Sequence, residues 1–416
     1  MSEGKISVGI LGGGAAGLYA ACCFVKFLGG RDIEITIIER NSIPGKKLIL
    51  TGHGRCNITN RKDPSDLKKG YHEAENFIYP ALREFGPEDT IRFFEDDLGL
   101  KVKEEDDNRI FPVCDSAVTV RDTILSYLSG TVKILTGTRV SGIKTGDVFT
   151  VSTTNGELIF DLLILSCGGS SFPKTGSAGD SYKLAEDLGH TVIPARGALA
   201  PVTVDNESRR FTSGLSGVSV NSKVSLFVDG KMVRSHTGEM LFADFGLTGP
   251  AIMEISREIP GIIKANAFLE LDLIPDINDE QLDQELQKLI GAHPDTKIVN
   301  LIAKYIPSSV AGEICKRVDV HDLYAQGFTK ENRKKLCREL KHLNITIAEP
   351  SSFDKAYVTR GGVSLKEVDR KTMESKKVKG LYILGEALDV DGISGGYNLQ
   401  ACMSEAYLAA KSILKN

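Results

Sequence analysis

ISVGILGGGAAG, residues 6 to 17, is the stretch that decides the fold of this chain. Its apolar first half predicts a buried parallel strand, and the apolar residues behind the glycines recur at helical spacing. A second apolar run, from Glu34 to Ile38, ends directly before the acid Glu39. Strand, glycine turn, helix, strand and terminal acid in this order form the G-x-G-x-x-G arrangement of a dinucleotide-binding unit.

Each residue type in this arrangement has a physical task. Gly12 permits the tight turn, Gly14 lets the backbone approach a pyrophosphate, and Gly17 lets the helix pack closely on the strand. Ala15 and Ala16 open the helix, whose free N–H groups and partial positive charge attract phosphate. Glu39 is expected to accept hydrogen bonds from ribose hydroxyls, and Arg40 beside it is assigned to the same site. The alternative, an ordinary glycine turn, does not account for the acid at this spacing.

The segment from Arg40 to Asn60 is dense in glycine and small polar residues. Such a composition is typical of a loop that lies along a ligand. Arg55 is a candidate for a bidentate pair with a phosphate or a carboxylate. A basic surface turn is the alternative. The cofactor-binding candidates in this loop are Lys46, Lys47, Gly54, Arg55, Cys56 and Asn57.

Residues 132 to 165 alternate in the manner of strands, and we expect a meander of 132–135, 139–144, 148–153 and a long apolar strand over 158–165. That last strand ends in a glycine pair, which predicts a second close approach of backbone to ligand. From this region we assign Val140, Cys167, Gly168 and Gly169 to the cofactor site.

The end of the chain repeats the pattern of its beginning, an apolar strand followed by glycines and a helix. An apolar strand over 380–384 leads into a glycine-rich stretch, and a helix is expected from Ala401 to Leu414. The glycine pair before that helix has backbone donors that favour an anionic partner. The cofactor-binding candidates here are Gly385, Glu386, Asp391, Gly395, Gly396, Tyr397 and Asn398.

The pattern predicts an α/β fold in several domains, because 416 residues exceed a single core. A Rossmann-like domain is expected over 1–195, completed by 351–416. Between these parts we expect an antiparallel, β-barrel-like insertion over 196–275, with the hairpin turn Asp229-Gly230. A small helical domain over 276–343 follows, and 344–350 returns to the insertion.

Composition excludes several classes of function. The net charge of −4 offers no basic excess for nucleic acid, and the basic stretch from Thr329 to His342 carries a leucine stripe typical of a solvated helix. No apolar run is long enough to span a membrane, and the acidic start lacks a signal peptide's basic region. Eight cysteines without C-x-x-C or metal-ligand spacing predict reduced thiols in a cytoplasmic protein with no metal site. The sequence gives no indication of oligomeric state.

Two glycine-lined helix starts, a strand ending in glycines and a ribose acid fit an extended cofactor, and FAD fits best. Its adenosine is expected at Glu39, its pyrophosphate at Gly12 to Gly17, and its ring at the start of the C-terminal helix. N–H groups of Gly396 to Asn398 are candidates for stabilising negative charge on the reduced ring.

With these stretches in view, the chain resembles the FAD-dependent oxidoreductases that include aminoacetone oxidases and bile-acid-reductase-like flavoproteins, within the two-dinucleotide-binding-domain group. The resemblance implies noncovalent FAD, an inserted β-barrel domain, a helical domain and a small-molecule substrate. The matching segments are Gly12 to Gly17, Gly45 to Asn60, Arg109 to Pro112, Cys167 to Asp180, Leu241 to Ala251, Thr359 to Val363, Thr372 to Ser375 and Gly385 to Gln400.

The catalytic candidates are Arg360, Tyr397 and His53, with loop capping, packing or surface exposure as the alternatives. Only one G-x-G-x-x-G is present, so NADH or NADPH, if it is the electron donor, must dock at the flavin face without a domain of its own. We expect a flavoenzyme that moves a hydride between flavin and a small organic molecule. The alternatives are a non-catalytic flavin-binding or sensing protein and an RNA-modifying flavoprotein.

Overall fold

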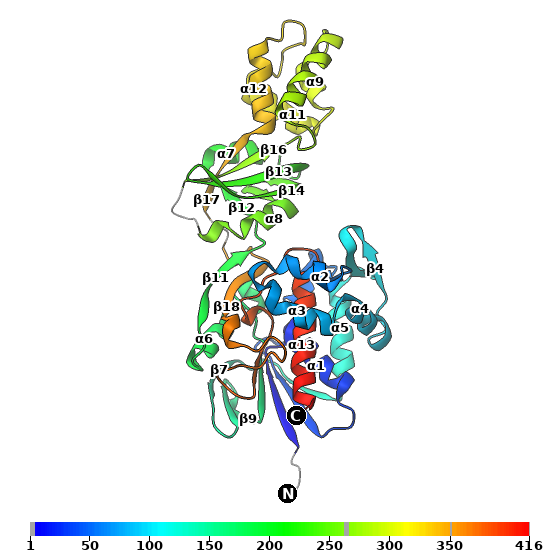
Figure 1. Ribbon diagram of the computed structural model, residues 1–416, viewed down its shortest axis with the longest axis vertical. Coiled ribbons are helices and arrows are strands. Elements are labelled where there is room, and N and C mark those ends of the chain that lie inside the picture. The colour runs from blue at the N-terminus through cyan, green and yellow to red at the C-terminus, as the bar shows by residue number, and fades with distance from the viewer. Residues whose placement is uncertain (1–4, 262–265, 350–351, 416) are drawn as a thin grey trace. The chain divides into compact units, whose positions relative to one another are not determined.

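The computed structural model describes residues 5–261, 266–349 and 352–415 (Figure 1). The chain divides into two compact units, Met1–Gly197 with Tyr357–Asn416, and Ala198–Ala356. Residues 350 and 351, at the expected junction of the last two segments, and the acidic N-terminal start lie outside the described residues. The α/β fold class with a barrel and a helical part is confirmed.

The first unit is built on a five-stranded parallel sheet in the order β19-β10-β1-β2-β6. Its strands are β1 (Ile6–Leu11), β2 (Ile33–Ile38), β6 (Val132–Leu135), β10 (Leu162–Leu165) and β19 (Leu381–Ile383). The last four residues of β1 and of β2 and the last three of β10 are buried, which explains why these strands are mostly apolar. The sheet therefore joins the beginning, the middle and the end of the chain.

The glycine turn connects β1 to α1 (Ala15–Phe27) as predicted. Gly12 has a φ of 104°, and its N–H donates to the carbonyl of Ile38 at 2.9 Å. A Cβ on Gly17 would lie 2.0 Å from the carbonyl oxygen of Gly12. Only glycine at position 17 allows the helix to pack this closely on the turn.

The prediction of one meander over 132–165 is wrong in two places. Strand β6 pairs in parallel with β2, because α5 (Ala117–Leu128) carries the chain over to the edge of the main sheet. The expected long strand over 158–165 is two strands. Asp161 separates them by accepting hydrogen bonds from the Ser7 backbone and hydroxyl at 2.7 and 2.6 Å. The antiparallel sheet contains only β7 (Val140–Lys144), β8 (Phe149–Thr153) and β9 (Gly156–Phe160).

The C-terminal helix α13 (Tyr397–Lys415) begins four residues earlier than predicted, since the N–H of Gln400 already donates to Gly396. Figure 1 shows α13 beside α1, and the two helices pack together. Helix α3 (Glu75–Glu84) covers α13 as well. The other α-helices of this unit are α2 (Pro64–Leu67), α4 (Pro87–Arg92) and α6 (Asp180–Asp187). A small antiparallel sheet contains β3 (Thr59–Asn60), β5 (Arg109–Pro112) and β4 (Val102–Glu105), in that order. Strands β11 (Val192–Ala198) and β18 (Val358–Val363) form a further pair.

The second unit contains a closed barrel in the order β12-β15-β14-β13-β16-β17. Its strands are β12 (Val202–Val204), β13 (Ser219–Val228), β14 (Lys231–Ala243), β15 (Gly246–Thr248), β16 (Ala267–Asp272) and β17 (Leu343–Glu349). The β13–β14 hairpin turns at Asp229-Gly230, as predicted. Alternate residues of these strands are buried, so the barrel has its own core.

The helices of the second unit are α7 (Asn206–Ser213), α8 (Pro250–Ser256), α9 (Asp279–Ala292), α10 (Ile298–Ile302), α11 (Ser308–Arg317) and α12 (Lys330–Lys341). Helix α12 is the basic stretch, and its leucines are buried as expected. Lys341, the last residue of α12, is an exception to the expected solvated face. It is 4% exposed and pairs with Asp272 at 2.7 Å. Among the described residues, no helix combines the length and apolarity needed to cross a bilayer.

A fully buried carboxyl group lies on α13. Glu405 accepts a hydrogen bond from the Gly385 N–H at 2.6 Å through Oε2, while Oε1 has no hydrogen-bond partner among the described atoms. Burial raises the pKa of Glu405 from its ordinary value of 4.5 to about 8. The carboxyl is therefore protonated in the folded protein at neutral pH.

We expect Gly17→Ala to lower the free energy of unfolding by about 1–3 kcal/mol, because its methyl group must displace the Gly12 backbone. Gly14→Ala is the matched control. A Cβ at Gly14 meets nothing within 4 Å, so its loss is expected to stay below about 1 kcal/mol. Urea unfolding of the flavin-free proteins measures both values, and equal losses would contradict this account of the turn.

We expect Glu405→Gln to stabilise the protein progressively, relative to the wild type, as pH rises from 5 to 8. Above pH 5 the unfolded carboxyl is ionised while the folded one is still mostly protonated, so the contribution of Glu405 to wild-type stability falls by up to about 1.4 kcal/mol per pH unit and levels off as pH reaches the folded pKa of about 8. Gln keeps the acceptor for Gly385 and does not titrate. Urea unfolding at several pH values measures the difference, which would remain constant if burial of Glu405 had no energetic consequence.

Candidate functional site

The acid at the end of β2 is bound to the glycine turn. Glu39 is 6% exposed, and its Oε2 accepts from the Gly13 N–H at 2.9 Å. Its Oε1 accepts from the backbone and side-chain N–H groups of Asn41, both at 2.7 Å. The carboxylate thus lies directly beside the glycine loop, as the fingerprint requires.

The start of α1 leaves room for a ligand. A methyl group on Gly14 would meet no atom within 4 Å, so the chain itself gives no steric reason for a glycine there. Gly14 is also the N-cap residue of α1, and it has no side chain that could accept hydrogen bonds from the first helix amides. Ala15 and Ala16 follow with the first helix amides, which have no intrahelical acceptors. This arrangement fits the pyrophosphate of a dinucleotide.

The loop after β10 runs beside this turn. The thiol of Cys167 donates to the carbonyl of Leu11 at 3.3 Å, and burial raises its pKa to about 12. Such a thiol is not a nucleophile at neutral pH. Gly168 has a φ of 79°, and a Cβ on Gly169 would lie 2.4 Å from the hydroxyl oxygen of Thr359. The glycine pair therefore lets this loop reach β18.

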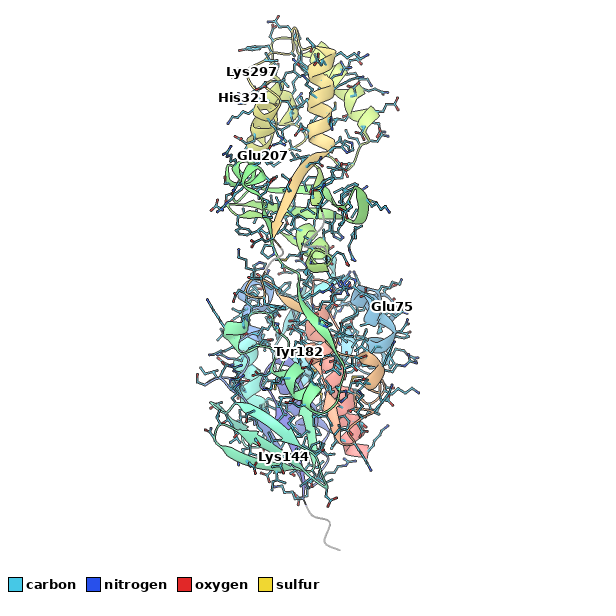
Figure 2. The ribbon with its side chains drawn as sticks, turned by 90° about the vertical axis from the view of Figure 1, so that its left-hand side faces the viewer. Glu75, Lys144, Tyr182, Glu207, Lys297 and His321 are labelled. Atoms are coloured by element: carbon cyan, nitrogen blue, oxygen red, sulfur yellow. The ribbon has the colours of Figure 1, made fainter. Side chains whose placement is uncertain are left out.

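A polar network joins three segments that are far apart in the sequence. Lys47 Nζ lies 2.8 Å from both carboxylate oxygens of Glu386 and 2.6 Å from the hydroxyl of Ser171. The hydroxyl oxygen of Thr359 accepts from the N–H groups of Ser170 and Ser171 at 2.8 and 2.9 Å. Tyr182, labelled on α6 in Figure 2, donates to the carbonyl of Glu386 at 3.1 Å. Lys47 and Glu386 were predicted site residues, whereas Ser171 and Thr359 were missed.

Position 385 brings the last strand to the first helix. Gly385 has a φ of 64°, and a Cβ there would lie 2.9 Å from that of Ala16. The two glycine-containing ends of the chain thus meet at one edge of the parallel sheet. Parallel strands present their carboxyl ends together at such an edge, which is where nucleotides bind.

Several predicted residues make contacts within the protein. Arg40 pairs with Asp180 at 2.9 Å, and Arg139 pairs with the other oxygen of Asp180 at 2.7 Å. Next to Arg139, Val140 is buried at the start of β7. Lys46 is half-buried in the loop after β2.

Arg55 is occupied by two carboxylates. It pairs with Glu105 and, at 2.8 Å, with Asp115, and its guanidinium lies 4.2 Å from the centre of the Phe111 ring. The expected pair of Arg55 with a ligand phosphate or carboxylate therefore has internal competitors, which stiffen the loop. The neighbouring Cys56 is buried with its pKa raised to about 12 by burial.

The glycine pair before α13 is held by the loop after β2. The Asn57 side chain, with its amide oxygen toward the donor, accepts from the Gly396 N–H at 3.1 Å. A Cβ on Gly396 would lie 2.4 Å from the Thr59 backbone, and the carbonyl of Gly395 accepts from Asn60 at 3.1 Å. The sequence predicted that the Gly396 N–H would donate to the flavin. In the structure this N–H donates to the side chain of Asn57 instead.

The next two residues close the loop before α13. The Asn398 side chain accepts from the Gly392 N–H at 2.8 Å and donates to the Gly392 carbonyl at 2.9 Å, which holds this loop closed. Tyr397 is 3% exposed, and its ring centre lies 5.7 Å from that of Tyr71. Lys62, another residue that the sequence did not single out, donates to the Tyr397 hydroxyl at 3.2 Å. Packing accounts for much of the position of Tyr397, and its catalytic assignment stays a prediction.

Arg360 and Asp391 line a pocket of about 240 Å³ in the first unit. The charged groups around it are Glu73, Arg196, Arg360, Asp389 and Asp391. Arg360 lies 3.5 Å from Glu73, and the Gly361 N–H donates to Asp389 at 2.9 Å. Burial raises the pKa of Asp389, and that hydrogen bond opposes the rise. Apolar side chains, those of Ala74, Ile193, Pro194 and Leu365, line the pocket beside these charged groups.

His53 lies on the exposed side of the loop after β2, between Gly52 and Gly54. All three have positive φ, of 57°, 56° and 87°. Its ring centre lies 6.3 Å from that of Tyr357. In the described residues no cluster of three or more His, Cys, Asp or Glu side chains is arranged to hold a metal ion.

We expect Thr359→Val to lower the free energy of unfolding by about 1–3 kcal/mol, because it leaves two backbone N–H groups without their acceptor. Thr359→Ser is the control, since it keeps the hydroxyl and is expected to lose less. Urea unfolding gives the free energies, and hydrogen exchange at Ser171 reports the loop directly. Unchanged protection of Ser171 in the valine variant would contradict the role given to Thr359.

Comparison with known proteins places this geometry in a family. The family model described as "HI0933-like protein Rossmann domain" matches residues 6–412. A 3-dehydro-bile acid delta(4,6)-reductase of Clostridium scindens is 31% identical over 410 residues, which cover 97% of this chain and 98% of that protein. A ribosomal RNA dihydrouridine synthase of Escherichia coli is 28% identical over 410 residues, covering 97% of both chains.

A solved flavocytochrome c3 fumarate reductase aligns over 100% of this chain and 79% of its own, at 14% identity and a TM-score of 0.48. The resemblance to the bile-acid-reductase-like flavoproteins is confirmed by the family match and by the relative from Clostridium scindens, both of which span nearly the whole chain. The chain belongs to the HI0933-like protein Rossmann domain family.

Proposed function

We propose that this protein is an FAD-dependent reductase that reduces a carbon–carbon double bond conjugated to a carbonyl group in a small organic molecule. The observation that carries the proposal is the meeting of the Gly12–Gly17 turn, Glu39 and Gly385 at one edge of the parallel sheet, with open space at Gly14. Bound FAD would supply a two-electron transfer to such a bond, and the protein would bind and orient both partners.

We assign the binding of FAD to residues at both ends of the chain. The first amides of α1 and the backbone at Gly14 would hold the pyrophosphate, and Glu39 would hold the ribose. The ring would lie beside the loop of Asn57 and the glycine pair Gly395-Gly396. The contact of Asn57 with Gly396 supports this assignment, because it joins the two loops in one rigid wall.

The names of the relatives support the reaction class. One is a reductase of delta(4,6) bonds in a 3-dehydro-bile acid, and the other makes dihydrouridine. Both names describe the saturation of a carbon–carbon double bond in a ring. In each ring a carbonyl group conjugated to that bond would stabilise the negative charge that develops during hydride addition.

We infer that the electron donor and the substrate use one face in turn, the ping-pong pattern. The single G-x-G-x-x-G turn supports this, since NADH or NADPH has no second fingerprint to bind. The eight cysteines are free thiols, which supports a cytoplasmic location.

RNA is the second candidate substrate. The dihydrouridine synthase of Escherichia coli matches 97% of this chain, and its name states action on ribosomal RNA. The net charge of −4 favours a small molecule over RNA. A non-catalytic flavin-binding protein would show neither activity.

The test is anaerobic mixing of the FAD-loaded protein with NADH or NADPH, followed by addition of a 4-en-3-one steroid, uridine or ribosomal RNA. We expect the visible absorbance of the oxidised flavin to bleach with one nicotinamide and to return with one of the acceptors. Stable bleaching with every acceptor would favour the sensing role. Colourless protein that takes up no FAD would refute the proposal as a whole.

Gly14→Ala tests the cofactor site separately from the chemistry. We expect this variant to bind FAD at least about tenfold more weakly, because a methyl group would enter the space assigned to the pyrophosphate. Equilibrium dialysis measures the affinity. Wild-type affinity in Gly14→Ala would remove the pyrophosphate from this position.

A further inference from the structure

Three rings from separate segments come together in the first unit. The ring centres of Phe172 and Tyr357 lie 5.3 Å apart at an interplanar angle of 88°, the favourable edge-to-face geometry. The His53 ring lies 6.3 Å from Tyr357 and is tilted by 54°. We call these three residues the aromatic triplet. His53 comes from the loop after β2, Phe172 from the loop after β10, and Tyr357 from the position directly before β18.

The aromatic triplet does not belong to the core. Phe172 and Tyr357 are half-buried and His53 is exposed. Among the described residues, neither Phe172 nor Tyr357 is part of the hydrophobic core or packs against it. Two neighbouring rings that lie outside the core and keep part of their surface exposed offer a flat face on which a ligand ring can stack.

Two members of the triplet are held in an unfavourable backbone conformation. Phe172 has a φ of 53° and His53 a φ of 56°, the left-handed region that bulky side chains rarely adopt. Glycine or asparagine would make these turns at lower cost. Such strain is found where the position of a side chain matters to function.

The polar network fixes the backbone beneath the rings. Ser171, which precedes Phe172, bonds to the side chain of Thr359 and, at 3.4 Å, to the carbonyl of Tyr357. Lys47 and Glu386 complete this network. The rings are therefore positioned by the same residues that join the two ends of the FAD-binding domain.

We propose that the aromatic triplet is the surface on which the substrate ring stacks, and that it selects planar rings with a carbon–carbon double bond conjugated to a carbonyl. This rests on the proposed function, whose substrate class it narrows. A planar, polarisable ring gains from stacking on aromatic faces, while a flexible open-chain molecule of the same reactivity does not. The enone of a 4-en-3-one steroid and the base of uridine share this chemistry, since each presents a flat, conjugated C=C–C=O face.

The chain contains no tryptophan, so a single one can report on the site. We expect Tyr357→Trp, in the FAD-loaded protein, to show a saturable fluorescence change with either a 4-en-3-one steroid or uridine, and none with an open-chain enone. The response to the steroid or to uridine distinguishes the two sources of the ring. Tyr324→Trp, on the exposed surface of the second unit, is the matched control and is expected to stay unchanged.

Phe172→Gly distinguishes a role in binding from a role in folding. Relief of strain at the φ of 53° opposes the loss of the contact with Tyr357, so the free energy of unfolding should change little, whereas loss of the ring should weaken binding of the responding probe about tenfold. A structural role for Phe172 would give the reverse, with lower stability and unchanged affinity. That result would overturn the inference.

The outcomes also separate this inference from the proposed function. Flavin content and anaerobic bleaching are read from the flavin absorbance, whereas the stacking is read from tryptophan fluorescence at equilibrium. If the protein binds FAD and reduces a probe but Tyr357→Trp does not respond to that probe, the inference fails and the proposed function stands. If no flavin binds and no probe alters the fluorescence, both fail.

Discussion

The close approach of Gly17 to the carbonyl of Gly12 is the constraint on which the first unit depends. No side chain fits between them, since a Cβ would lie 2.0 Å from the Gly12 oxygen. This contact sets the angle at which α1 leaves β1, and it directs the first amides of the helix toward the open space at Gly14. Glu39 reinforces the turn through the Gly13 N–H, so the acid and the turn form one rigid unit. A ligand that binds there meets donors already in position, which lowers the entropic cost of binding.

The same helix also receives the end of the chain. Gly385 lies against Ala16, and its N–H donates to a buried Glu405 on α13. A carboxyl without water is expensive to ionise, which is why it remains protonated in the fold. The two ends of the polypeptide are thus joined by backbone contacts that tolerate only glycine at the crossing points. The segment between them, which forms the barrel and the helices of the second unit, has its own core.

The polar network of Lys47, Ser171, Thr359 and Glu386 joins segments of the first unit that are far apart in the sequence. It holds the loops after β2 and β10 against β18. It also fixes the backbone next to Phe172 and Tyr357 of the aromatic triplet. Its groups are mostly satisfied within the protein, so it acts as a scaffold. Arg55, Asn57 and Asn398 act in the same way, since each bonds to other parts of the protein. Arg55 pairs with Glu105 and Asp115, Asn57 accepts from Gly396, and Asn398 accepts from Gly392. The pocket at Arg360 lies in the same unit and is lined by charged and apolar side chains.

The sequence by itself determined the strand, turn, helix and acid of the dinucleotide unit, the alternating strands of the barrel and its hairpin turn, because these depend on periodicity and on glycine at fixed spacing. It did not reveal that Asp161 divides one apolar run between two sheets, because a run of alternating residues carries no record of its partner strand. It also could not show that Arg55 is bound by Glu105 and Asp115, or that Ser171, Thr359 and Tyr357 support one site. Arg55 lies 50 and 60 positions from its two carboxylates, and Ser171 lies 188 positions from Thr359, so these residues meet only in the folded chain. Tertiary structure decided them, since side-chain partners depend on distances in space that local spacing does not encode.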